Sequence, residues 1–286
     1  MRYFLFNFLQ QLTWILPLKV SYALADFGGW LQYVFSTKDR HAVMSNLKTL
    51  TGQKDVRLSA LRVFQNFGRY LVDFCRMTRV VTPTYIDENI DVVGMEHIDA
   101  VLAQGKGGVI LTAHMGNWEV GGAVLAQRGY PFHGIALPHN KSALNDWFNA
   151  QRAGCGIRSI PSHNAVRSCL EVLNKNALVG IVADRDFSRT GVTMSFLDRD
   201  FSVPKGAALF AYKTGAAVLP IFFYRQDNGR WCLQCFEPVY PENLIKDQLT
   251  DDDIKQFSRR YLPVFDKMIR SYPTQWLMFR EYGKEV

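Results

Sequence analysis

The feature that most constrains the fold is an alternation, beginning after Pro83, between short apolar runs and longer stretches with helical spacing. The apolar runs are rich in Val, Ile, Leu and Phe, and they have the length of strands rather than of helices. Parallel strands that are buried on both faces have this character, and helices connect them. The sequence therefore predicts an α/β fold with a mostly parallel central sheet flanked by helices, whose strands are Val109 to Ala113, Phe132 to Leu137, Leu178 to Ala183 and Ala217 to Phe223.

Other segments add to this framework. Two further β-rich runs, Gly191 to Phe196 and Arg230 to Val239, are expected to form a hairpin or edge strands. Apolar residues at three- and four-residue spacing predict an amphipathic helix over residues 54–80, packed on the core. Thr250 and the acidic triplet that follows it are typical of a helix N-cap and first turn, which predicts a helix as far as about Arg270.

The first 35 residues have a different character, because they are apolar and carry few charges. No charged residue lies between Tyr3 and Leu18, and as one helix that stretch would span about 24 Å, short of the roughly 30 Å hydrocarbon core. A cleaved signal peptide ending at Ala25 is the alternative, but Lys19 interrupts the apolar run. We expect residues 1–35 to form an uncleaved membrane-associating helical segment, either spanning or lying on the membrane. Residues 36–286 are expected to form the α/β domain.

Charge narrows the set of partners. Lys and Arg number 33 against 26 Asp and Glu, so the formal net charge is +7. Such a balance favours an anionic partner: a membrane surface, an acidic carrier protein, a phosphorylated substrate or a nucleic acid. The basic residues are dispersed rather than gathered in a recognition motif, so we expect no nucleic-acid partner.

The five cysteines are odd in number and scattered, which is poor material for a disulfide framework. Cys232 and Cys235 form a CxxC pair, but they lie in a predicted strand. Their odd separation would point the two thiols to opposite faces of the sheet. No second pair completes a zinc site, and we expect no metal.

The stretch from Gly107 to Glu119 carries the candidate chemistry. It resembles a buried strand that ends at His114 and continues into a turn. Ligands of open α/β sheets bind beyond the carboxyl ends of the strands, where His114 would lie. If a helix begins near Asn117, the Glu119 carboxylate can accept a hydrogen bond from one ring nitrogen and leave the other as a base. A capping or packing histidine is the alternative reading. No serine or cysteine nucleophile lies nearby, so such a pair suits activation of a substrate hydroxyl.

His114 and Glu119 match the HX4(D/E) motif of the glycerolipid acyltransferases, and their surroundings resemble the late lipid A biosynthesis (lauroyl/myristoyl) acyltransferase family. The similarity covers nearly the whole chain. Its further blocks keep the order and rough spacing of the family: Leu137 to Arg152 with Asn140 and Lys141, Ala183 to Asp186, Phe196 with Pro204, and Tyr272 to Leu277.

This resemblance implies an O-acyltransferase that moves a fatty acyl group from a thioester of acyl carrier protein, or of coenzyme A, to a lipid hydroxyl. No metal or organic cofactor is implied. His114 would deprotonate the attacking hydroxyl and Glu119 would orient its imidazole. The expected acceptor is a lipid A precursor of lipopolysaccharide, at the cytoplasmic face of a bacterial inner membrane. A phosphatidylinositol mannoside and a lysophospholipid are the alternative acceptors.

Five residues are candidates for substrate binding. The backbone at Gly116 and the amide of Asn117 are potential oxyanion donors. Arg152 and Asp184 match blocks of the family and would hold the acceptor headgroup or the donor, unless they only pair with each other. Arg185 departs from the family, which more usually has glutamine there. A basic rim facing phosphates is expected from Lys141, Arg158, Arg185, Arg199 and Lys205.

Two other classes of function compete with this interpretation. Asp184 to Asp186 and Asp198 to Asp200 both read as DxD, which can hold a divalent ion in a glycosyltransferase, but that reading leaves the His114 block unexplained. A non-enzymatic protein that binds anionic lipid through its basic surface and aromatic N-terminal segment is the second. The sequence has no Walker A motif and no G-x-G-x-x-G between a strand and a helix, which argues against nucleotide binding. It also has no G-x-S-x-G motif, which argues against a serine hydrolase.

Overall fold

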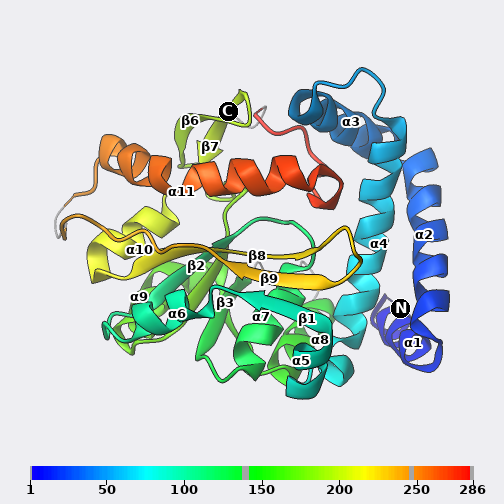
Figure 1. Ribbon diagram of the computed structural model, residues 1–286, viewed down its shortest axis with the longest axis horizontal. Helices are drawn as coiled ribbons and strands as arrows, with labels where there is room; N and C mark the ends of the chain where they lie inside the picture. The colour runs from blue at the N-terminus through cyan, green and yellow to red at the C-terminus, as the bar shows by residue number, and fades with distance from the viewer. Residues whose placement is uncertain (1, 137–141, 245–247, 284–286) are drawn as a thin grey trace.

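The computed structural model describes residues 2–136, 142–244 and 248–283. In this part of the chain a seven-stranded sheet is covered by helices on both faces (Figure 1). Its strands are β1 (Ile90–Val93), β2 (Gly108–Thr112), β3 (Phe132–Ala136), β4 (Arg158–Pro161), β5 (Leu178–Val182), β8 (Ala217–Arg225) and β9 (Trp231–Cys235). A separate two-stranded sheet pairs β6 (Val192–Phe196) with β7 (Arg199–Val203).

The described helices fall into an N-terminal group and a group that flanks the sheet. The N-terminal group contains α1 (Arg2–Ile15), α2 (Leu18–Phe35), α3 (Thr37–Thr51) and the long α4 (Arg57–Val80). Around the sheet lie α5 (Pro83–Asn89), α6 (Met95–Leu102), α7 (Trp118–Gln127), α8 (Ser142–Gly154), α9 (Ala165–Asn174), α10 (Gly206–Thr214) and α11 (Asp251–Ser271). Two 3₁₀ turns, η1 (Ser162–Asn164) and η2 (Pro273–Gln275), complete the set.

The sheet has the order β1-β9-β8-β2-β5-β3-β4. From β8 to β4 all neighbouring strands are parallel, which confirms the predicted mostly parallel sheet. The predicted second β-rich region is a hairpin, because β9 pairs antiparallel with β8, and β1 then pairs parallel with β9. Since β2, β5 and β8 are parallel, their carboxyl ends meet at one edge of the sheet, and that edge carries the site described below.

Two apolar cores lie on opposite faces of this sheet. One contains residues of α9, α10 and α11, and the other contains residues of α4 to α8. Cys232 belongs to the first core and Cys235 to the second, so the strand alternation indeed separates the two thiols. Helix α11 opens with the predicted cap: Thr250 and Asp253 exchange the reciprocal hydrogen bonds of a capping box.

The predicted N-terminal apolar segment forms two helices rather than one, because Pro17 interrupts it. None of the described helices is both long enough and apolar enough to cross a bilayer. Helix α2 packs closely on α4 at two glycines: a Cβ on Gly29 would lie 2.7 Å from the carbonyl oxygen of Phe64, and one on Gly68 would lie 2.6 Å from that of Ala25. Residues 1–35 therefore lie directly on the long helix that also contributes to the core of the α/β domain.

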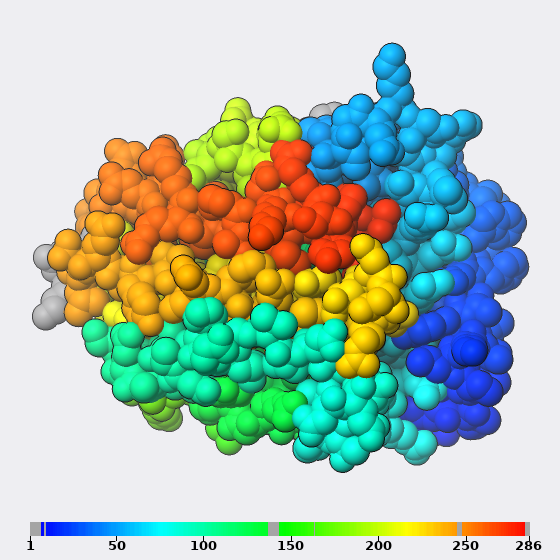
Figure 2. Space-filling model, viewed as in Figure 1, coloured from blue at the N-terminus to red at the C-terminus, as the bar shows by residue number. Residues whose placement is uncertain are grey.

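The outer side of α1 and α2 is strongly apolar. Figure 2 shows these N-terminal helices at one end of the molecule. Nine of the large exposed hydrophobic side chains belong to this pair: Phe8, Ile15, Leu18, Val20, Leu24, Phe27, Trp30, Val34 and Phe35. We call these nine residues the apolar face. Large apolar side chains exposed together on one helix pair are typical of a surface that contacts a membrane or another molecule.

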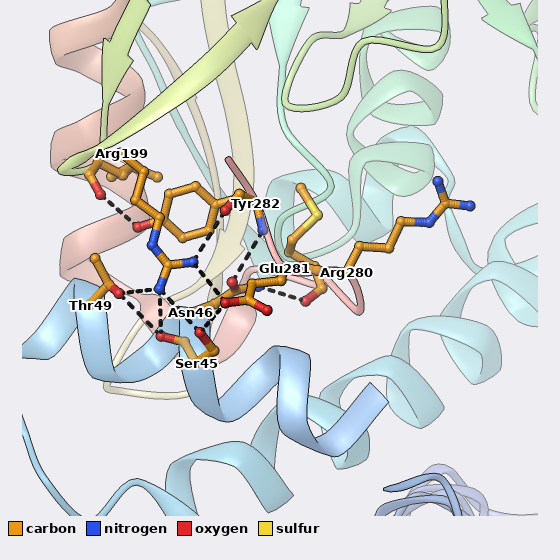
Figure 3. Close-up of polar contacts among 9 residues, drawn as sticks. Ser45, Asn46, Thr49, Arg199, Arg280, Glu281 and Tyr282 are labelled. Carbon is orange, nitrogen blue, oxygen red and sulfur yellow. Dashed lines mark hydrogen bonds and ion pairs between the residues drawn. The ribbon is translucent and has the colours of Figure 1, made fainter. Parts of the chain in front are cut away.

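The segment after η2 runs back across the molecule and is fastened by α3 and β7 (Figure 3). The Arg199 guanidinium donates to the Thr49 hydroxyl at 2.5 Å and to the main-chain oxygen of Tyr282 at 3.2 Å. Asn46 donates to the main-chain oxygen of Arg280 at 2.7 Å. These contacts hold residues 276–282, which reach the site, in a fixed position.

Candidate active site

His114 lies just beyond the carboxyl end of β2, as the sequence predicts. Its backbone is held on both sides. The His114 amide donates to Asp184 at 3.0 Å, and the His114 carbonyl accepts from the amide of Leu277 at 2.7 Å. Asp184, the second residue after β5, and the segment that follows η2 thus both bind the backbone of this histidine.

The carboxylate that binds the His114 ring is that of Asp184. Nδ1 of His114 lies 2.6 Å from Oδ1 of Asp184, and Oδ2 of Asp184 accepts from the indole N–H of Trp276 at 2.7 Å. Asp184 is 1% exposed, so nearly all its hydrogen-bonding capacity is taken up by these neighbours. An ionised carboxylate on Nδ1 fixes the proton there and leaves Nε2 as the basic nitrogen.

Asp184 is ionised at every pH of ordinary use. Burial raises its pKa, but the charge and hydrogen bond of His114, the nearby Arg185 and the Trp276 indole outweigh burial and lower the pKa to about 2. Because the folded-state pKa lies below the ordinary value of 3.8, the stability that this carboxylate contributes is fully present above that pH. It is lost as the pH falls toward the folded-state value.

Glu119 does not bind the His114 ring, and the predicted partner of the imidazole was wrong. Its carboxylate forms a two-point ion pair with Arg152, at 2.6 Å to Nη2 and 3.0 Å to Nε. Glu119 lies in the first turn of α7 and Arg152 in the last turn of α8, so the pair joins two helices. The alternative that Arg152 pairs with Asp184 is also wrong, since each has another partner. In this structure Glu119, five residues after His114, contributes to the contact between α7 and α8.

The expected oxyanion donors at Gly116 and Asn117 are already engaged, so that assignment was wrong for these groups. The Gly116 amide donates to Gln275, and the Asn117 amide donates to Phe223. The Asn117 side chain caps α7 by accepting from Val120, and its NH₂ donates to Tyr70. Gly116 has a φ of +57°, and a Cβ there would lie 2.0 Å from the Phe223 carbonyl. This turn is therefore structural: it delivers His114 and the start of α7.

Two backbone donors remain at the first turn of α7. In the described part of the chain, the amides of Trp118 and Glu119 donate to no protein acceptor, as is usual for the first residues of a helix. The Trp118 ring lies edge-on to the His114 ring at a centroid distance of 4.8 Å and stacks on Tyr70 at 4.5 Å. A developing negative charge near His114 would meet the positive end of this helix.

An apolar cavity extends from these residues across the sheet toward β3. One side is formed by Trp118 and the Glu119–Arg152 pair, and the remainder is mainly aliphatic, aromatic or glycine. A Cβ on Gly134 of β3 would make only ordinary van der Waals contacts, the nearest at 3.9 Å from Ile157. Gly180 differs, because a Cβ there would lie 2.5 Å from the Phe132 ring. The cavity lining also includes Ile110, Gly121, Gly122, Leu125, Ile157, Val182, Ile221 and Leu233.

Arg185 lies at the site, whereas most of the expected basic rim does not. Its guanidinium donates to the main-chain oxygen of Leu277. Arg158 begins β4 and so lies at the opposite end of the strands, Arg199 is held by α3, and Lys205 pairs with Asp251. Lys141, Asn140 and Leu137 lie outside the described residues.

The aspartates of the two DxD sequences do not come together at one site. Asp184 binds His114, while Asp186 accepts from Ser188, Gly191 and Ser202. Asp198 pairs with Arg270. Within the described residues, no group of three or more His, Cys, Asp or Glu side chains is placed to hold a metal ion.

Trp276 is the functional residue that sequence reasoning missed. It lies in a block that resembles the family, but nothing in its local spacing indicates that its indole binds a carboxylate 92 residues away. The sequence predicts Asp184 at the same sheet edge as His114, because both residues follow buried strands, but it did not predict that their side chains bind each other. The signal that was available is topological, since adjacent parallel strands bring the residues that follow them to one edge.

Comparison with known proteins adds to this geometry. A phosphatidylinositol mannoside acyltransferase of Mycobacterium tuberculosis (strain ATCC 25618 / H37Rv) is 30% identical over 222 residues, 76% of this chain and 67% of that protein. Its counterpart from Mycolicibacterium smegmatis is 26% identical, over 93% of this chain and 88% of that protein. The lipid A biosynthesis lauroyltransferase of Escherichia coli (strain K12) is 24% identical, over 75% of this chain and 71% of that protein.

The family model described as bacterial lipid A biosynthesis acyltransferase matches residues 1–284, which is nearly the whole chain. The relatives and the family are acyltransferases, which agrees with a histidine base at a sheet edge beside an apolar cavity. The chain therefore belongs to the bacterial lipid A biosynthesis acyltransferase family and is an acyltransferase.

Proposed function

We propose that this protein transfers a fatty acyl group from a thioester, carried by acyl carrier protein or coenzyme A, to a hydroxyl of a membrane glycolipid. The observation that carries the proposal is the His114–Asp184 pair beside an apolar cavity. Among the described residues, no serine, threonine or cysteine side chain is hydrogen-bonded to the His114 ring. A histidine arranged in this way activates a hydroxyl that the substrate brings.

In this mechanism Nε2 of His114 removes the proton of the acceptor hydroxyl as its oxygen attacks the thioester carbonyl. Asp184 holds the required tautomer and stabilises the imidazolium that forms. The first amides of α7 face the negative charge on the carbonyl oxygen. Collapse of the tetrahedral intermediate breaks the C–S bond, and the imidazolium returns the proton to the departing thiolate. General-base help of this kind contributes typically about 10²- to 10⁴-fold.

The Glu119–Arg152 pair acts through position in this account. It fixes the start of α7 against α8, and the preceding residue, Trp118, lies edge-on to the His114 ring. We assign Arg152 this positioning role in place of the substrate contact expected from the sequence. Arg185 remains a candidate for the acceptor headgroup.

The acyl chain of the donor is placed in the apolar cavity. Its lining is mainly hydrophobic, and Trp118, which lines it, lies edge-on to the His114 ring. A thioester at His114 would then direct its hydrocarbon tail toward Phe132 and Gly134, away from water.

The acceptor belongs to one of two glycolipid classes. A lipid A precursor is the first expectation from the resemblance, and the similarity to a lauroyltransferase supports it. A phosphatidylinositol mannoside is the second candidate, favoured by the higher identity to two enzymes that bear that name. Both classes of lipid carry phosphate and sugar hydroxyls.

We also place the protein on the cytoplasmic face of a bacterial inner membrane, with the apolar face of α1 and α2 in the lipid. Large apolar side chains exposed along one helix pair are typical of a helix that lies in the interface. Phe27 and Trp30 stack on each other in the middle of this face, at a centroid distance of 5.7 Å.

Acyl transfer is tested first with labelled acyl carrier protein and a panel of acceptors: a lipid A precursor, a phosphatidylinositol mannoside and a lysophospholipid. We expect one glycolipid to be labelled and His114→Ala to lower the rate about 10²- to 10⁴-fold. Transfer that survives in the variant would refute the base, and no transfer from either carrier to any acceptor would refute the enzyme proposal.

The two carboxylates are separated by pH–rate profiles of Asp184→Asn and Glu119→Gln. Asp184→Asn should lower kcat about 10⁴-fold, because an amide favours the wrong imidazole tautomer. Glu119→Gln should keep the wild-type profile shape. The single variant Glu119→Gln leaves the buried Arg152 without its ion pair. The double variant Glu119→Gln/Arg152→Leu, which removes both charges, is therefore measured as well. The opposite pattern would return Glu119 to the dyad.

Gly134→Leu tests the place of the acyl chain. The new side chain would fill part of the cavity, so kcat/KM for a long-chain donor should fall about 10-fold more than for a short-chain donor. The ratio of the two donors within one variant is its own control for folding. An unchanged ratio would mean that the acyl chain lies elsewhere.

Membrane binding is tested by flotation with anionic vesicles. Phe27→Ser/Trp30→Ser should lower the bound fraction about 10-fold or more, because two aromatic side chains leave the lipid. Val166→Ser is the matched control, since Val166 is also exposed but belongs to α9. Equal flotation of both variants would show that the apolar face does not bind the vesicles. A protease added outside intact spheroplasts tests the location separately, because a protein on the cytoplasmic side should be protected from it.

A further inference from the structure

We infer that Gln275 is a positioning residue of the acyltransferase site, whose side chain fixes the segment that binds Asp184 and His114 to the end of β8. The inference rests on the proposed role of His114 as the base, and it adds a residue on which the orientation of that base depends. Gln275 is the last residue of η2 and directly precedes Trp276, whose indole binds Asp184.

Strand β8 is longer than its neighbour β2, and this difference leaves main-chain groups of β8 to be bound in another way. The pairing of the two strands ends at Leu111 and Pro220, whereas β8 continues to Arg225 with β9 along its other edge. On the edge that β2 no longer covers, the Phe223 carbonyl accepts from the Asn117 amide at 3.1 Å. Main-chain groups of alternate residues point to the same edge of a strand, so Arg225 presents the next pair of groups there.

The Gln275 side chain binds Arg225 as a neighbouring strand would. Its Oε1 accepts from the Arg225 amide at 2.9 Å, and its Nε2 donates to the Arg225 carbonyl at 2.6 Å. A glutamine amide carries an acceptor and donors on one planar group, so it can satisfy both main-chain groups of a single residue. The Arg225 guanidinium is held in turn, because it donates to the Tyr22 hydroxyl of α2 at 2.8 Å. Gln275 is thus attached to a strand end that β9 and α2 hold in place.

The main chain from Gln275 onward carries this attachment to the base. The Gln275 carbonyl accepts from the Gly116 amide at 2.9 Å, and the Trp276 indole donates to Asp184 at 2.7 Å. Leu277 then donates from its amide to the carbonyl of the catalytic histidine. Three consecutive residues therefore bind the base, its loop and its carboxylate partner, and Gln275 is the one that fastens them to β8.

A fault in this attachment should affect the rate of the reaction more than the binding of substrates. One oxygen of Asp184 accepts from Trp276 and the other binds Nδ1 of His114. A displacement of Trp276 would therefore turn the carboxylate, and the imidazole with it. Misplacing a catalytic group by about 1 Å can lower a rate about 10²-fold. The side chain of Gln275 is bound to Arg225, so its effect is exerted through Trp276.

The test replaces Gln275 with methionine, which has a similar length and cannot form either hydrogen bond to Arg225. We expect kcat to fall about 10- to 100-fold while KM for donor and acceptor stays unchanged. In proton NMR of protein labelled with ¹⁵N in histidine, the Nδ1 proton of His114 should exchange faster with water and become less deshielded. Gln127→Met is the matched control, because the Gln127 side chain also donates to a main-chain carbonyl, that of Cys155, but lies at the end of α7. This control should keep the wild-type kcat and the wild-type Nδ1 signal.

A double-variant cycle with Trp276→Phe tests the route of the effect. Trp276→Phe removes the indole donor to Asp184, so Gln275→Met has less left to disturb in that background. The combined loss of kcat should be clearly smaller than the product of the two single losses. A full product would overturn the inference, because Gln275 would then act by another route. A rise in KM with kcat unchanged, or a wild-type kcat and Nδ1 signal in Gln275→Met, would overturn it as well.

Gln275→Glu keeps the inference testable if Gln275→Met does not fold. A carboxylate still accepts from the Arg225 amide but cannot donate to the Arg225 carbonyl, so kcat should fall here too. A wild-type kcat and Nδ1 signal in this variant would overturn the inference. The NMR signal does not depend on turnover: full activity of His114→Ala would refute the proposed function, whereas the Nδ1 signal of Gln275→Met would still report whether Gln275 positions the ring.

Discussion

The site depends on one buried contact, the 2.6 Å hydrogen bond between Nδ1 of His114 and the carboxylate of Asp184. An ionised group that is almost fully buried is costly unless its oxygens are bound on all sides. Here the His114 ring and amide and the Trp276 indole supply those bonds. The same contacts that make the buried charge tolerable also orient the imidazole, so stability and chemistry place the same demand on these residues.

The requirement for Asp184 explains why distant segments converge. Trp276 can reach the carboxylate only if the segment after η2 crosses the end of the sheet, and Leu277 then binds the His114 carbonyl. The polar cluster around Arg199 anchors the end of that segment on α3. Through α4, which packs on α2 and α3 and contributes to the second core, the N-terminal helices rest on the same framework.

The sequence predicts much of the fold because burial has a local signature. The apolar runs at β2, β3, β5 and β8 are continuous, and the cap at Thr250 is complete within four residues. The short strands β1 and β4 escaped prediction because four residues carry little periodicity. The division of the N-terminal apolar segment into two helices at Pro17 was not predicted.

The candidate site was predicted only in part. His114 was found because it follows a buried strand and belongs to a recognisable motif. Its partner was misassigned because a spacing of five residues allows contact with Glu119 but does not require it. Asp184 binds the imidazole because β5 lies next to β2 in the sheet, and Glu119 is instead paired with Arg152. Neither strand order nor a contact between helices α7 and α8 can be read from local sequence.

The most direct test of this account is proton NMR of protein labelled with ¹⁵N in histidine, with the His114 signals assigned by their loss in His114→Ala. We predict a strongly deshielded, slowly exchanging proton on Nδ1, which disappears in Asp184→Asn and persists in Glu119→Gln. A proton that persists without Asp184 and disappears without Glu119 would contradict the account.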